Sequence, residues 1–225
     1  MSILEVSTAF NRGELREPAY KKLIKDICDL NWSGLTQEDL ISVAWAYYYF
    51  SIQFRECLEI ACKLHPEDER LLELDRGERD TSNLSPWPGV AAPEERMNHD
   101  EFMRRTLELT QISESRKREL AAFGQRYLTS TRAMDPHVRA LALASYEDGG
   151  LEAVFGAFLT APIWDGPVLQ AFRHFLEEHI RFDSDPDAGH GALCRHLVPD
   201  ERVGPLWAEF KQILIEAAPR LAQPR

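Results

Sequence analysis

The chain has 225 residues, 44% of them hydrophobic and 28% charged, and carries a formal net charge of -11. This length and apolar content suffice for one domain with its own core, so a single domain over residues 1–225 is expected. The negative charge argues against nucleic acid as a partner, because such binding depends on Lys and Arg neutralising phosphates.

Apolar stretches are interrupted by charge well before the roughly 18 residues that a membrane span needs. The N-terminus also lacks a signal-peptide pattern, so we expect a cytoplasmic protein without a membrane segment. The four cysteines show no CxxC or finger-like spacing. This spacing predicts reduced, partly buried thiols rather than a zinc module or a disulfide framework.

Helical periodicity dominates the first third of the chain. A first helix is expected within residues 17–30 and a longer one within residues 35–64. Thr36 and Asp39 fit a capping box at the start of the longer helix. Apolar residues nearly encircle that helix, which predicts a deep position.

Residues 75–93, DRGERDTSNLSPWPGVAAP, are rich in turn-forming residues. They predict a long irregular loop, which we expect to lie beside a metal site formed by later helices. Pro93 marks the expected start of the next helix. Six further helices are predicted over residues 94–110, 113–131, 136–148, 151–160, 166–183 and 201–221. About eight helices without a strand indicate an all-α bundle.

The helix over residues 166–183 carries ionisable residues on its apolar face. His179 and Asp183 continue the stripe formed by Phe172, Phe175, Leu176 and Ile180. Charge is rarely buried without a partner or a metal. His179 and Asp183 are also one turn apart, a spacing that lets an imidazole and a carboxylate reach one ion.

Two other helices show the same feature. Glu147 shares a face with Ala140, Leu143 and Ala144, so its carboxylate is expected to be buried. His99 shares its face with Met103, Thr106 and Leu107, and Glu95 stands one turn earlier on the same side. A carboxylate and a histidine are again paired.

His190 follows a break in the helical pattern. The Asp185–Pro186 pair disfavours helix continuation, so we expect the helix to end near Asp183 and Pro186 to open a turn that returns His190 to the site. Asp187 is a competing carboxylate. Each such residue alone is more often a hydrogen-bonded structural group, but inward carboxylates and imidazoles on several helices are how bundles build di-metal sites.

The order HDEFMRRTLEL, then YED before a glycine pair, then HIRFD followed by HG, resembles the heme-oxygenase-like diiron oxidase superfamily over roughly residues 40–220. The fold is shared with heme oxygenase, thiaminase II and pyrroloquinoline-quinone synthase. The resemblance implies a bundle of seven to eight helices, a tendency to form homodimers, and two irons that activate dioxygen. It places metal ligands at His99, Glu147, His179, Asp183 and His190.

The sequence departs from the family pattern in two places. The family spaces its last three ligands closely, whereas SDPDAG separates Asp183 from His190, which leaves Asp187 or no residue as the sixth ligand. The early carboxylate is expected near SNLSPWPG, where none stands. Glu95 is the nearest substitute by its facing, and Glu78 is a weaker one.

Imidazole with carboxylate suits iron or manganese, and open positions on Fe(II) let dioxygen bind. We therefore expect a metal-dependent oxidase or oxygenase acting on a small organic substrate such as an amine or amino acid, a substrate class that rests on family analogy alone. One alternative is a metal-free bundle that binds a small molecule or a partner protein, with His179 and Asp183 hydrogen-bonded to each other. Another is a cofactor-free oxidase resembling the quinone synthase.

The two histidines near the C-terminus are expected to differ when metal is absent. His179 lies on a regular helix and should be well ordered. His190 lies between two glycines, where ordering the backbone costs more entropy, so we expect His190 and SDPDAG to be displaced.

Overall fold

The computed structural model describes residues 18–80, 83–183 and 189–224, without the side chain of Asp183. These ranges are helical, and their only β-type pairing is an isolated bridge between Trp87 and Ala91. The prediction of an all-α protein is therefore confirmed at this level. The α-helices of the described ranges are α1 (Ala19–Cys28), α2 (Gln37–Leu64), α3 (Glu69–Arg79), α4 (His99–Glu108), α5 (Glu114–Arg132), α6 (Pro136–Glu147), α7 (Gly150–Phe158), α8 (Pro167–Asp183), α9 (His190–Cys194) and α10 (Gly204–Ala217).

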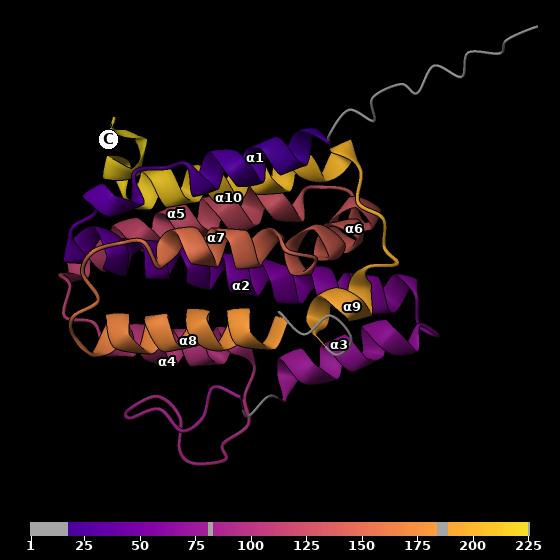
Figure 1. Cartoon of the computed structure of the whole chain (residues 1–225), viewed down its shortest axis with the longest axis horizontal. Coiled ribbons are helices and arrows are strands. Elements are labelled where there is room, and N and C mark those ends of the chain that lie inside the picture. Colours follow the sequence, from indigo (N-terminus) through magenta and orange to yellow (C-terminus); the bar gives the residue numbers. More distant parts are fainter. Residues whose placement is uncertain (1–17, 81–82, 184–188, 225) are drawn as a thin grey trace, which may run out of the picture.

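Helix α2 runs through the middle of the bundle (Figure 1). The predicted capping box is present, because the Thr36 hydroxyl accepts from the Asp39 N–H at 3.2 Å and the Asp39 carboxylate accepts from the Thr36 N–H at 2.9 Å. Half of the 28 residues of α2 are buried, as its encircling apolar pattern predicts. This helix packs against α3, α4, α5, α6, α8 and α10.

The other helices form groups around α2. Helices α4 and α8 pack together on one side, and α1, α5 and α10 lie on the other (Figure 1). Short helix α9 rests on α3 and α6 at one end of the bundle. That end is where α3, α4, α6, α8 and α9 come together, so it joins segments that are far apart in the sequence.

The predicted loop over residues 75–93 begins too early. Helix α3 continues to Arg79, and Asp68 caps its start by accepting from the N–H groups of Arg70 and Leu71 at 3.1 and 3.3 Å. Irregular backbone follows in residues 83–98. The helix expected to start at Pro93 starts at His99, because Glu94 has φ of +61°, in the left-handed region.

The helix count of about eight was also too low. The described ranges contain ten α-helices, and the two that the sequence pattern missed are α3 and α9. Helix α9 has only five residues and a glycine at its second position. So short a helix carries no readable periodicity. In the described residues, no helix combines the length and the apolar character that crossing a membrane requires.

Thiol labelling tests this packing. Cys57 and Cys194 have no exposed surface, whereas Cys28 and Cys62 are partly exposed. Burial also raises the pKa of Cys57 to about 12. A thiol reagent added to native protein should modify Cys28 and Cys62 first and the other two only as the structure opens. Peptide mass spectrometry reads the sites; equal rates at all four cysteines before denaturant is added would contradict the fold.

Candidate metal centre

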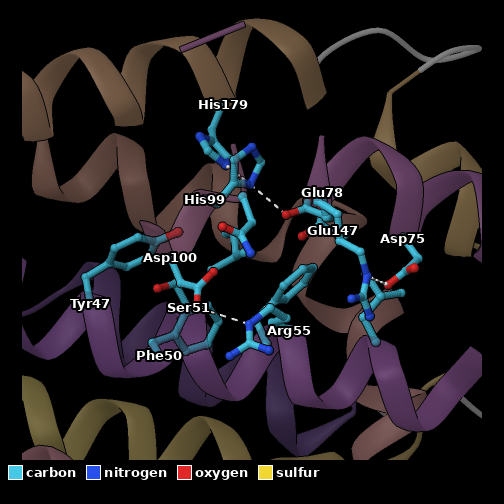
Figure 2. Close-up of a pocket in the computed structure, with 15 residues that line it drawn as sticks. Tyr47, Phe50, Ser51, Arg55, Asp75, Glu78, His99, Asp100, Glu147 and His179 are labelled. Atoms are coloured by element: carbon cyan, nitrogen blue, oxygen red, sulfur yellow. Dashed lines mark hydrogen bonds and ion pairs between the residues drawn. The ribbon is translucent and has the colours of Figure 1, made fainter. Parts of the chain in front are cut away.

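Five ionisable side chains from five helices meet where α3, α4, α6, α8 and α9 come together. We call Glu78, His99, Glu147, His179 and His190 the five-residue cluster. Each of the five residues is only 5 to 7% exposed. Figure 2 shows four of them, without His190, turned toward one another.

Close backbone approach places α9 in this cluster. A Cβ atom added to Gly191 would lie 2.9 Å from the carbonyl oxygen of Glu147, so only glycine lets α9 pack this tightly on the end of α6. A Cβ on Gly77 would lie 3.5 Å from Nε2 of His190. Helix α6 ends at Glu147 because Gly149 takes a left-handed φ of +88° before α7.

The carboxylate of Glu78 joins the imidazoles of two other helices. Its Oε2 lies 2.6 Å from Nδ1 of His99, and its Oε1 lies 2.9 Å from Nδ1 of His190. The same Nδ1 of His190 lies 3.5 Å from Oε2 of Glu147. Nε2 of His179 lies 3.0 Å from Nδ1 of His99. Each oxygen of Glu78 therefore faces its own set of neighbours.

The ring of His179 has a fixed proton position. Its Nδ1 lies 2.8 Å from the carbonyl oxygen of Phe175, and because a carbonyl only accepts, Nδ1 donates. Nε2 then carries a lone pair directed into the cluster. Burial lowers the pKa of His179 well below its usual value, so the ring is neutral. A donated N–H that orients the opposite nitrogen is typical of metal-binding histidines.

Charge in the cluster is concentrated on one ion pair. Burial alone would raise the pKa of Glu78, but the charges of His99 and His190 hold it well below the usual value. Burial alone would lower the pKa of His190, but the charge of Glu78 and the hydrogen bonds that the His190 ring donates to Glu78 and Glu147 hold the pKa well above its usual value. Burial raises the pKa of Glu147. Without a metal, protons therefore occupy the cluster.

The cluster fits a metal by donor type but not by present spacing. In the described ranges, no group of three or more His, Cys, Asp or Glu side chains is placed to hold a metal ion as it stands. The reason is that the donors bond one another directly. Two ligands on one ion with bonds near 2.1 Å are roughly 3 Å apart, close to the 3.0 Å between His179 and His99 and the 2.9 Å between Glu78 and His190. Two of the donor-to-donor distances therefore already fall in the range expected for ligands of one ion.

The structure brings together four residues that the sequence singled out, namely His99, Glu147, His179 and His190. Glu95 lies elsewhere, and its assignment to the cluster was wrong. Its carboxylate contacts Arg105 at 2.8 Å and accepts from the N–H of Ala92. Because α4 starts at His99, Glu95 belongs to the preceding loop and not to the helix face of His99.

Glu78, the weaker of the two predicted carboxylates, occupies the place in the cluster that was predicted for Glu95. A signal for it stands in the sequence, because Asp68 provides a helix cap and Leu71, Leu74 and Glu78 share one face at spacings of three and four. His190 starts α9 and is buried against Glu78, and its expected displacement in metal-free protein stays a prediction. Asp187 and most of SDPDAG, with the side chain of Asp183, lie outside the described residues.

A small cavity adjoins the cluster and was not predicted. Apolar side chains of α2 line one side, among them Tyr47, Phe50 and Phe54. Arg55 and Asp100, paired at 3.1 Å, line another (Figure 2). Its volume of about 20 Å³ admits a water molecule or an ion, not an organic molecule. Arg55 is a charge on a mostly apolar helix, which is the signal that sequence reasoning passed over.

Replacing each of the two candidate glutamates with glutamine tests whether the cluster binds metal. Glu78→Gln keeps the side-chain volume but removes the charge that both imidazoles contact, so Fe(II) or Mn(II) affinity should fall by about 100-fold or more. Glu95→Gln, which alters a carboxylate outside the cluster, should bind as the parent does. Anaerobic metal titration measures both, and equal affinities in the two variants would count against a metal centre here.

Alanine at two glycines tests the docking of α9. Gly191→Ala should lower the free energy of unfolding by about 1–3 kcal/mol, because its Cβ would collide with the Glu147 carbonyl. Gly156→Ala is the control, since its Cβ would meet nothing within 4 Å. This variant should raise the free energy of unfolding by up to about 1 kcal/mol, because alanine has a higher helix propensity than glycine. Denaturant titration measures the free energy of unfolding of both variants. An unchanged value in Gly191→Ala would mean that α9 does not pack tightly on α6.

Comparison of the chain with protein-family models, with curated proteins and with solved structures found no match. The similarity of the HIRFD and HG segments to the heme-oxygenase-like superfamily therefore stays a prediction. Function has to be inferred from the five-residue cluster itself.

Proposed function

We propose that this protein is a non-heme iron oxidase or oxygenase of the heme-oxygenase-like diiron class, acting on a small organic substrate such as an amine or amino acid. One observation carries the proposal: the buried carboxylate of Glu78 presents one oxygen to His99 and the other to His190. A carboxylate whose two oxygens face two nitrogen donors on different helices is suited to lie between two metal ions.

The cluster divides into two ligand sets around Glu78. His99, His179 and Oε2 of Glu78 would hold one ion, and His190, Glu147 and Oε1 of Glu78 would hold the other. Nitrogen and oxygen donors of this kind suit iron and manganese. Ligands bind in their deprotonated forms, so metal binding must displace the proton of His190 and the affinity should rise with pH.

Bound Fe(II) would supply open coordination positions at which dioxygen binds and is reduced. The chain itself contributes orientation and exclusion of water. His179 is held by Phe175, and the rings of Phe155 and Phe175 lie 5.8 and 4.1 Å from its ring centroid. A substrate would approach past the Arg55–Asp100 pair, and the cavity there must widen to admit it.

Charge balance bears on the number of ions. With neutral imidazoles, Glu78 and Glu147 carry two negative charges, which balance one divalent cation. A second cation needs another anion, because unbalanced charge in a protein interior is costly. Asp183, one turn after His179 in the sequence, is the candidate that the residue pattern supplies. Asp183→Asn is therefore expected to lose one of two ions and keep the other.

A second candidate function is a metal-free bundle that binds a small molecule or a protein partner. The contacts of Glu78 with His99 and His190 favour it, because they surround the buried carboxylate with partners without any metal. Both ring nitrogens of His179 contact groups other than Asp183, so holding His179 in place does not depend on the predicted hydrogen bond between His179 and Asp183.

Metal analysis separates the two functions. Protein purified without air and supplied with Fe(II) should hold close to two irons per chain, and His179→Ala should hold far less because the preoriented Nε2 is gone. His174→Ala, on the same helix but bonded to the carbonyl of Leu84, is the matched control and should keep the parent stoichiometry. Mixing loaded protein with dioxygen should oxidise the iron, seen as new absorbance in the near ultraviolet and visible range. Absence of iron in the parent protein would favour the metal-free bundle.

A further inference from the structure

Helices α3 and α9 carry Glu78 and His190, and a second polar contact ties the same two segments together. Nε2 of His196, two residues after α9, lies 2.5 Å from Oδ2 of Asp68, the N-cap of α3. Both side chains are about one-fifth exposed. We call Asp68 and His196 the clasp.

The two oxygens of the Asp68 carboxylate contact different groups. Its Oδ1 accepts from the N–H groups of Arg70 and Leu71 and so caps α3, while its Oδ2 is left for His196. Hydrogen bonds to the charged form outweigh burial and hold the pKa of Asp68 below its usual value. The clasp therefore fixes His196 to a rigid point, the first turn of α3.

The Glu78–His190 contact and the clasp lie at opposite ends of the contact between α3 and α9. Asp68 precedes the first residue of α3 and Glu78 lies in its last turn, while His190 starts α9 and His196 follows its end. Between these two polar links, the ring of His190 lies against α3, where a Cβ on Gly77 would be 3.5 Å from its Nε2, an ordinary van der Waals distance. A five-residue helix has no independent stability. The position of His190 thus depends on contacts that α9 makes with its neighbours.

Metal binding would change the balance between the links. In the structure, Glu78 and His190 contact each other directly at 2.9 Å. If both become ligands of one ion, that ion replaces the direct ion pair, and the clasp is the polar link from α9 to α3 that forms without metal. Arg195 also pairs with Asp148, but both side chains are about half exposed, where an ion pair contributes little.

We propose that Asp68 and His196 are positioning residues of the metal centre, which hold α9 against α3 so that His190 and Glu78 bind metal together. The metal part of this inference rests on the proposed function. The positioning of α9 can be measured without any metal.

The clasp is tested with two variants and two controls. Asp68→Ser keeps a good N-cap for α3 but lacks the second oxygen that holds His196. His196→Ala removes the other partner, and His196→Gln restores an N–H donor of similar reach. Asp135→Ser is the matched control, because Asp135 caps α6, the helix of Glu147, through the same kind of contacts to backbone N–H groups.

Labelling of Cys194 reports on α9, and labelling of Cys57 in α2 reports on global opening, since neither thiol is exposed. In metal-free protein, Asp68→Ser and His196→Ala should label Cys194 about tenfold faster or more, with Cys57 unchanged, because only local opening becomes easier. Their Fe(II) affinity should fall by about tenfold or more. His196→Gln and Asp135→Ser should behave nearly as the parent.

Each result has a distinct meaning. Unchanged Cys194 labelling in both clasp variants would overturn the inference, and so would equal acceleration at Cys57, which would indicate general destabilisation. Parent affinity for Fe(II) in variants whose Cys194 labels faster would also overturn it. If the parent itself binds no Fe(II) or Mn(II), the proposed function fails, while selective acceleration at Cys194 would still support the role of the clasp in placing α9.

Discussion

The end of the bundle where five helices meet depends on one buried carboxylate. Glu78 is 7% exposed and lies 2.6 Å from His99 and 2.9 Å from His190. A charge in the interior is costly unless partners surround it, and removing one partner of a buried pair is strongly destabilising. Helices α3, α4 and α9 are therefore coupled through this side chain. The groups that satisfy Glu78 without metal are also those that would share a metal with it.

Much of the fold could be predicted because it follows from local patterns. Periodicity indicated an all-α chain, and Thr36 with Asp39 marked the start of the central helix. Helix α3 was missed because Gly77 and the glycine- and proline-rich segment after it resemble one continuous loop. Helix α9 was missed because five residues show no period. Both are stabilised by tertiary contacts, which a single sequence does not display.

The candidate site was predictable to the extent that its residues lie on long helices. His179 continues an apolar stripe, and Glu147 ends another, so both were expected to face inward and are buried. Glu95 was wrongly chosen over Glu78 because the start of α4 is set by the left-handed backbone at Glu94, which propensity did not reveal. The identity of the carboxylate that joins two histidines depends on how α3 packs.

The most direct measurement is anomalous X-ray diffraction from crystals grown with Fe(II) in the absence of air. A metal centre built around Glu78 predicts anomalous density within bonding distance of the Glu78 carboxylate, with nitrogens of His99, His179 and His190 turned toward it. Two peaks would correspond to the two ligand sets. A structure with Glu78 still bonded directly to His99 and His190, and with anomalous density absent or confined to the surface, would contradict the account.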